Sequence, residues 1–150
     1  MRNVKAAFVG TWKLVSVTAA TFKSDVNKVA LGRNPSGLLT YTADGRMMEI
    51  ISDDARKPFW IAGRVAAPTE ERAKAYSTFM AYAGRYTFTC DKVVTHVEIA
   101  LLQNWVNTEQ TRFATLQGDR MFVTYYFGAE HKKFAASSVL PVPLYLATCG

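Results

Sequence analysis

The chain has 150 residues, of which 49% are hydrophobic and 13% aromatic, and its formal net charge is +6. This length suits one domain with a hydrophobic core, and the composition excludes an intrinsically disordered chain. The 18 Lys and Arg residues are scattered, and the densest charged stretch, EERAK at 70–74, is mixed in sign, so the sequence does not predict a nucleic-acid-binding surface.

Most of the chain predicts short β-strands. The first covers residues 11–22, and residues 36–52 predict a hairpin whose turn contains Asp44 and Gly45, two residues that tolerate positive φ angles. The other predicted strands are residues 85–90, 92–102, 109–117 and 120–127, with a last one within 138–147 that Pro141 and Pro143 confine to an edge or an irregular closure.

Residues 68–85 interrupt this pattern and predict a helix. Thr69 can cap its start, and Gly84 can end it with a left-handed residue. Its apolar stripe, with spacings of three and four, consists of Ala73, Tyr76, Phe79, Met80 and Ala83. About eight strands and one short α-helix predict an all-β fold, a single antiparallel barrel over residues 1–150. A barrel of that size is wide enough to hold one small ligand.

Three pieces of the sequence together resemble one family. They are VGTWKLVS at residues 9–16, SGLLTYTADGRMMEII at 36–51, and FMAYAGRYTF at 79–88 followed by VVTHVEIALLQNWVNTEQTRF at 93–113. This ordered set resembles the lipocalin-like domain family of small calycin-type barrels, which is often associated with secondary metabolism. The resemblance implies a β-barrel with a cavity for an apolar small molecule and places Trp12 at the barrel floor. Some related barrels are cofactor-free isomerases or cyclases, and others only bind their ligand.

The predicted hairpin at residues 93–116 carries the polar residues with the clearest chemical potential. If its turn centres on Trp105, then Glu98 lies opposite Arg112, with His96 on the same face. That face can lie in solvent, where a Glu–Arg pair contributes about 0.2–1 kcal/mol. It can instead line the lumen, where the same pair can hold a polar atom of a ligand. The sequence leaves both orientations open.

The luminal alternative gives a catalytic hypothesis. Arg112, positioned by Glu98, would hydrogen-bond a carbonyl oxygen, and His96 would move a proton, in a cofactor-independent isomerase or cyclase acting on an apolar, partly oxygenated molecule. The alternative function is a binding or carrier barrel without chemistry. The predicted substrate-binding residues are Tyr41, Met47, Trp60, Phe79, Tyr82, Tyr86, Phe88, Trp105, Gln110 and Tyr125.

Several further expectations concern partners and location. No apolar run approaches about 20 residues, so a membrane-spanning helix is not expected. Cys90 and Cys149 can form at most one disulfide, and no Cys/His spacing indicates a zinc site. We therefore expect a cytoplasmic protein with a hydrophobic small molecule as partner, without metal, cofactor, nucleic acid or membrane. A homodimer is left open.

Overall fold

The structure is a computed structural model that describes residues 4–21, 24–29, 31–61, 63–127 and 130–138. In β2 and β9, and at the adjoining ends of β1 and β8, only the backbone is described. The elements are α1 (Val4–Phe8), β1 (Gly10–Thr21), β2 (Ser24–Val29), β3 (Ser36–Tyr41), β4 (Arg46–Ser52), α2 (Thr69–Ser77), β5 (Phe79–Thr89), β6 (Lys92–Ala100), the 3-10 turn η1 (Gln103–Trp105), β7 (Glu109–Gln117), β8 (Arg120–Phe127) and β9 (Glu130–Ser138).

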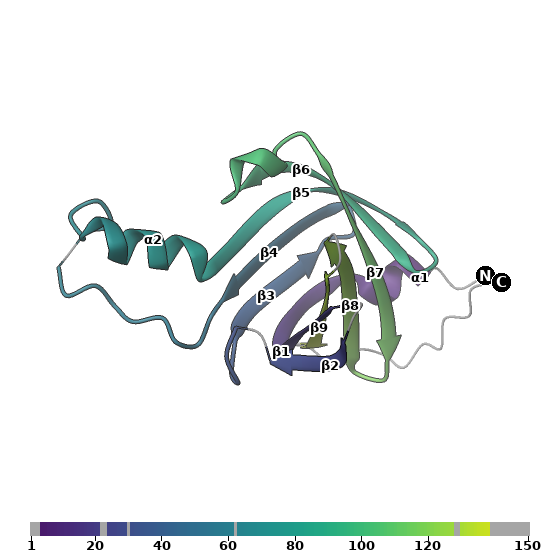
Figure 1. Cartoon of the computed structure of the whole chain (residues 1–150). Helices are drawn as coiled ribbons and strands as arrows, with labels where there is room; N and C mark the ends of the chain where they lie inside the picture. The colour runs from purple at the N-terminus through teal and green to yellow at the C-terminus, as the bar shows by residue number, and fades with distance from the viewer. Residues whose placement is uncertain (1–3, 22–23, 30, 62, 128–129, 139–150) are drawn as a thin grey trace.

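The strands form one antiparallel sheet that closes on itself (Figure 1). Their order is β2-β1-β3-β4-β5-β6-β7-β8-β9, and β1 also pairs with β9 from Trp12 to Thr21. Eight strands, β1 and β3 to β9, therefore follow one another around the ring. Strand β2 lies outside this ring order and pairs with the second half of β1. The prediction of an antiparallel barrel of about eight strands is confirmed. None of the helices in the described ranges is long and apolar enough to cross a bilayer.

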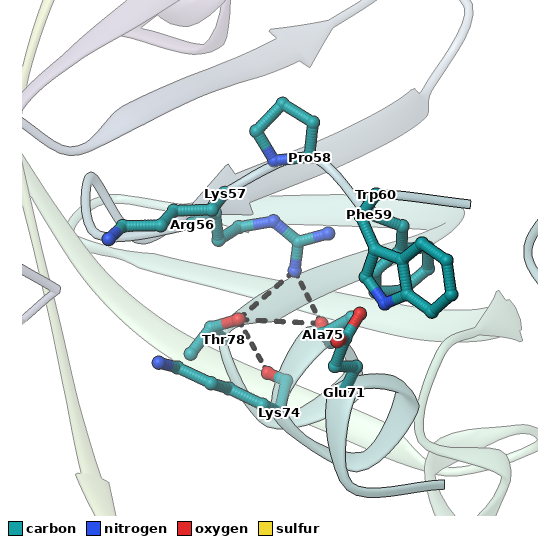
Figure 2. A pocket seen from close by; sticks show the side chains of 9 residues that line it. All are labelled: Arg56, Lys57, Pro58, Phe59, Trp60, Glu71, Lys74, Ala75 and Thr78. Carbon is teal, nitrogen blue, oxygen red and sulfur yellow. Dashed lines mark hydrogen bonds between the residues drawn. The ribbon is translucent and has the colours of Figure 1, made fainter. Parts of the chain in front are cut away.

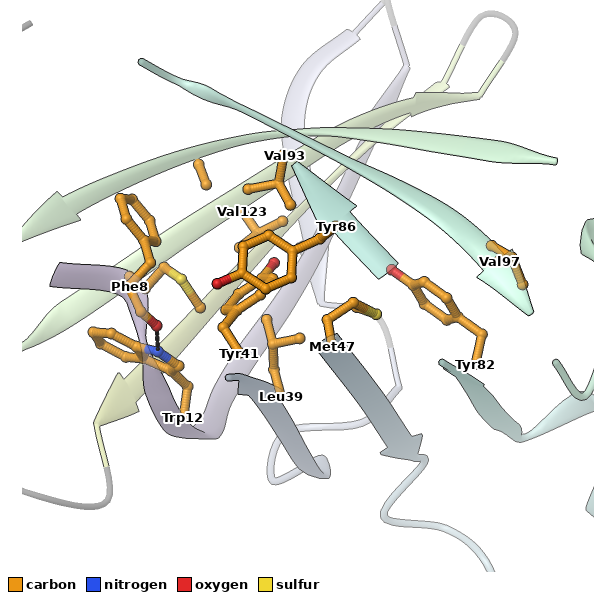
Figure 3. Close-up of a cluster of buried hydrophobic side chains, with 12 residues drawn as sticks. Phe8, Trp12, Leu39, Tyr41, Met47, Tyr82, Tyr86, Val93, Val97 and Val123 are labelled. Atoms are coloured by element: carbon orange, nitrogen blue, oxygen red, sulfur yellow. Dashed lines mark hydrogen bonds between the residues drawn. The ribbon is translucent and has the colours of Figure 1, made fainter. Parts of the chain in front are cut away.

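Alternating side chains of the strands fill one end of the barrel, where α1 lies (Figure 3). Trp12 is 1% exposed, and its indole Nε1 donates a hydrogen bond of 2.8 Å to the carbonyl oxygen of Phe8 in α1. The indole therefore closes the barrel floor and ties α1 to the first strand. A second, smaller apolar cluster contains Leu14, Val17 and Ile51.

The helix predicted for residues 68–85 is wrong beyond its first half. The helix α2 ends at Ser77, and β5 begins at Phe79. Met80, Tyr82 and Tyr86 also fit the two-residue period of a strand, and pairing with β4 selects the strand, which turns Tyr82 and Tyr86 inward. Gly84 is not a helix end: a Cβ there would lie 1.9 Å from the carbonyl oxygen of His96 on β6, so two strand backbones approach too closely for a side chain.

Four elements were not predicted from the sequence. These are α1, β2, η1 and β9. Strand β9 is rich in Lys, Ala and Ser, which have low strand propensity, and pairing with β1 and β8 on both sides holds it in the sheet. The last strand expected within residues 138–147 lies outside the described residues, apart from Ser138.

Candidate functional site

The register of the β6–β7 hairpin decides which polar side chains enter the barrel. Val93 pairs with Arg112, and His96 pairs with Glu109. The hairpin ladder closes where the amide of Val97 donates to the carbonyl oxygen of Thr108, and a long connection through η1 lies beyond it. The predicted pairing of Glu98 with Arg112 is therefore wrong. The two registers differ by an odd number of residues, which exchanges the faces of one strand relative to the other.

The outer face receives two of the three predicted catalytic residues. His96 lies on the outer face of β6, between Arg85 on β5 and Glu109 on β7. Glu98 forms salt bridges with Arg46 and with Arg85, the second with 3.0 Å between Arg85 Nε and Glu98 Oε1. These side chains are 38–66% exposed, and pairs of this kind contribute about 0–1 kcal/mol. His96, Glu98 and Arg112 thus do not converge.

Arg112 alone of the three lies inside the barrel, where it is 7% exposed. Its guanidinium carbon lies 5.9 Å from the centre of the Tyr82 ring and 5.8 Å from the centre of the Trp105 ring. One of its nitrogens donates a hydrogen bond of 3.1 Å to the carbonyl oxygen of Thr111. The two aromatic rings therefore hold the cation on the inner face of β7.

A carboxyl group that the sequence analysis did not select lies in the same lumen. Glu49 follows Met47 and precedes Ile51 on the inner face of β4, and it pairs with Tyr82 on β5. The Tyr82 hydroxyl donates a hydrogen bond of 3.3 Å to Glu49 Oε2. The signal available in the sequence was a single acidic residue within the apolar stretch MMEII at 47–51, on the same strand face as Met47 and Ile51. We call Glu49, Tyr82 and Arg112 the luminal polar group.

Burial shapes the electrostatics of this group. Burial raises the pKa of the Glu49 carboxyl, while the Arg112 charge and the Tyr82 hydrogen bond act in the opposite direction. Burial, followed by the Glu49 charge, also raises the pKa of Tyr82 and that of the neighbouring Tyr41. Both phenols consequently keep their protons and can donate hydrogen bonds. The lumen thus combines a cation, hydroxyl donors and a carboxyl that holds its proton more tightly than usual.

A cavity lies between the two apolar clusters and borders Glu49 and Arg112 of the luminal polar group. Its volume is about 20 Å³ among the described side chains, which is room for about one water molecule. A larger molecule would enter only if flexible lining side chains changed rotamer. The inward-facing side chains that line it are Trp12, Leu14, Leu39, Glu49, Ile51, Arg112 and Val123.

The predicted binding residues divide between the lumen and the outside. Phe79 lies on the outer face with the Arg56 guanidinium carbon 5.0 Å from its ring centre, and Trp60 is 75% exposed, so neither lines the lumen. The side chain of Tyr125 lies outside what the structure describes. The remaining seven lie within the barrel or against its core: Tyr41, Met47, Tyr82 and Tyr86 are buried, Phe88 and Trp105 pack against them, and Gln110 lies on the inner face of β7.

Glu49→Gln is expected to remove a pH dependence from the stability of the protein. Because burial raises the folded pKa of Glu49 above the unfolded value of about 4.3, this carboxyl costs no stability below that value and destabilises wild type as the pH rises toward and through the folded pKa. Glutamine cannot ionise, so the variant escapes this loss. Urea denaturation across about pH 4–8 measures the difference. Glu98→Gln, on the exposed face, is the matched control, and parallel curves for wild type and Glu49→Gln would contradict the expectation.

A closed antiparallel barrel of eight ring strands is an architecture of small-ligand-binding proteins. The chain matches the lipocalin-like domain family over residues 9–140, and it belongs to that family, as its three sequence pieces indicated. No curated protein matches this chain. Among solved structures it is similar to an uncharacterized protein from Bacteroides eggerthii DSM 20697, with 12% sequence identity, a TM-score of 0.44, and coverage of 85% of this chain and 98% of that one.

Proposed function

We propose that this protein binds a small, largely apolar molecule in the barrel lumen and holds it by a polar oxygen. The observation that carries the proposal is the burial of Arg112 beside Glu49 and Tyr82, at a cavity whose other lining side chains are apolar. Removing such charges from water costs several kcal/mol each, and a protein in which hydrophobic residues replace buried charged groups is often as stable as the original. Perturbed buried groups of this kind gather at functional sites.

The geometry favours an oxygen acceptor on the ligand. The guanidinium of Arg112, which lies beside the rings of both Tyr82 and Trp105, offers planar N–H donors that suit a carboxylate or a carbonyl. The apolar body of the ligand would pack against Leu39 and Val123, and it would displace side chains that now narrow the cavity. Such a ligand is recognised by one polar contact and a large apolar surface.

Two fluorescent probes with one ring system test this proposal. 1-Anilinonaphthalene-8-sulfonate carries an anionic group, and N-phenyl-1-naphthylamine does not. The sulfonate is expected to bind one to one and about tenfold or more tighter, because a charge-assisted hydrogen bond contributes about 1.5–3 kcal/mol. Decanoate should displace it from the lumen. Equal affinity for the two probes, or binding that decanoate does not reduce, would contradict the proposal.

A second candidate function is a cofactor-independent isomerase or cyclase at the same group. The observation that favours it is a carboxyl with a raised pKa next to a cation and a phenol. As carboxylate, Glu49 would remove a proton from a carbon beside a ligand carbonyl, and Arg112 and Tyr82 would donate hydrogen bonds to the enolate oxygen. In a β,γ-unsaturated ligand, Glu49 would return the proton to the γ-carbon, which moves the double bond into conjugation. In a cyclisation, the enolate carbon would add to a second carbonyl carbon of the same molecule, and the oxygen of that carbonyl would take the proton from Glu49. His96 and Glu98 have no part in this scheme, because they face outward.

Conversion of cyclohex-3-enone to its conjugated isomer tests this second candidate. The conversion should occur with wild type and be lost in Glu49→Gln. Glu98→Gln supplies a matched carboxyl on the outer face and should retain full activity. If wild type does not accelerate the conversion, or if both variants lose it equally, the catalytic role is wrong and binding alone remains.

A further inference from the structure

A long insertion between β4 and β5 extends away from the barrel (Figure 1). It comprises residues 53–61, residues 63–68 and α2, and we call it the arm. None of the residues of α2 is buried. Near the barrel, the amide of Asp53 donates a hydrogen bond of 3.0 Å to the carbonyl oxygen of Thr78. The Arg56 guanidinium donates one hydrogen bond to the carbonyl oxygen of Ala75 and another, of 3.1 Å, to the Thr78 hydroxyl (Figure 2). At its base the arm is also bonded to residues outside it, because the amide of Asp54 donates to the carbonyl oxygen of Leu31 and the Tyr76 hydroxyl donates to that of Leu101. From this base the arm extends away from the barrel.

The arm exposes large apolar side chains at several points. Trp60 is 75% exposed, Val65 76% and Tyr76 50%. Trp60 stands beside a groove of about 480 Å³ between residues 56–60 and α2, as Figure 2 shows. Exposed apolar groups in this number on one projecting element are unusual for a surface that meets only water.

The outer face of the barrel carries a second apolar surface next to the arm. Leu38 pairs with Ile50 across β3 and β4, and the next row contains Met48 on β4, Ala83 on β5 and Ile99 on β6. The four large side chains of this outer apolar face are 49–67% exposed. Register therefore makes them one continuous patch and not scattered residues.

We propose that two copies of this chain form a twofold dimer in which the arm of each copy lies across the outer apolar face of the other. The arm leaves from the ends of β4 and β5, which run through the middle of that face, and it extends beyond them, so it leaves its own face uncovered. A reciprocal exchange covers both surfaces on both copies and closes the assembly. The proposal is independent of the ligand in the lumen.

The area available agrees with a stable interface. The seven exposed side chains of the arm and the outer apolar face together present on the order of 800 Å² per copy, taking roughly 200 Å² for a whole large side chain. A standard interface buries about 800 Å² from each partner. The chain carries a net charge of +6, so two copies repel each other, and the contact must be apolar in origin. Added salt should therefore strengthen it.

Sedimentation equilibrium of the full chain over a range of concentrations tests the dimer. Wild type should show a monomer–dimer equilibrium that shifts toward dimer at higher salt. Val65→Lys on the arm and Ile99→Lys on the outer apolar face should each raise the dissociation constant about tenfold or more. Val9→Lys, at a side chain 36% exposed beside α1 and the opposite end of the barrel, is the matched control and should leave it unchanged. Circular dichroism verifies that all three variants fold.

A mixing experiment distinguishes the arm-to-face arrangement from other dimers. In a mixture of Val65→Lys and Ile99→Lys, the heterodimer gathers both substitutions in one contact and keeps the other contact intact. A contact already broken by one substitution loses little more through the second, so the heterodimer should form more readily than the homodimer of either variant. A dimer made by two arms, or by two faces, gives no such recovery. A monomeric wild type, a control that weakens the dimer as much as the variants, or a mixture without recovery would each overturn the proposal.

Discussion

Replacing Arg112 with methionine is expected to weaken binding of 1-anilinonaphthalene-8-sulfonate by about 10- to 100-fold, the equivalent of one charge-assisted hydrogen bond. Methionine keeps much of the length and the apolar contact of arginine but cannot donate to the sulfonate. Binding of the uncharged N-phenyl-1-naphthylamine should change little, because its contacts are apolar. Fluorescence titration of both probes gives the two affinities.

The matched control for this variant is Arg85→Met. Arg85 is one of the two arginines bound to Glu98, and its side chain is 66% exposed on the outer face of the barrel. Removing it deletes the same positive charge from the chain without altering the lumen, so probe affinity should stay as in wild type. A similar loss in both variants would mean that the sulfonate responds to net charge and not to the lumen.

The stability of the Arg112 variant carries separate information. Without the cation, the Glu49 carboxyl is buried beside only a phenol, and its pKa should rise further because the charge that lowered it is gone. Arg112→Met should therefore lose stability mainly at neutral and higher pH. Combining it with Glu49→Gln should recover much of that loss, since no charge then remains to be solvated. Equal losses in the single and double variants would show that Arg112 acts through packing alone.

Trp12→Ala is expected to cause the largest loss of stability among the substitutions considered, about 3–5 kcal/mol. The indole is 1% exposed, fills the barrel floor, and donates the hydrogen bond that Phe8 accepts. Alanine leaves a cavity there and removes the donor that the Phe8 carbonyl oxygen uses. Urea denaturation, followed by circular dichroism, gives the change in the free energy of unfolding.

Trp60→Ala is the matched control for that change. The substitution is chemically identical, but the Trp60 side chain is 75% exposed on the arm. At protein concentrations low enough to keep the chain monomeric, its effect should stay within about 0.5 kcal/mol. Comparable losses in the two variants would contradict the assignment of Trp12 as the closing residue of the core.

The barrel could be predicted because its signals are local. Alternating apolar residues, the turn at Asp44 and Gly45, and the Gly-x-Trp opening each act over a few residues, and together they indicated the sheet and the family. The end of α2 could not be predicted in the same way. The residues after it fit a helical stripe through Phe79, Met80 and Ala83 and also a strand face through Met80, Tyr82 and Tyr86, and only pairing with β4 decides between the two.

The site could be predicted only in part, because register is a property of the whole hairpin. The turn near Trp105 suggested one pairing, but the ladder closes between Val97 and Thr108, and the residues beyond form a separate connection. That difference moves Glu98 to the outer face and separates it from Arg112. Glu49 lies far from both in the sequence; pairing of β4 with β5 sets it beside Tyr82, and curvature of the sheet into a barrel brings Arg112 to the same lumen.

The most direct test follows the side-chain nitrogen of Arg112 by NMR while decanoate is added. If the luminal polar group holds the ligand's oxygen, the Arg112 Nε–H resonance shifts, saturates together with binding, and shows a nuclear Overhauser effect to the chain of the ligand. Over the same titration, the resonances of Arg46 and Arg85 on the outer face stay in place. Shifts at Arg46 and Arg85 with an unchanged Arg112 would show that the ligand binds outside the barrel.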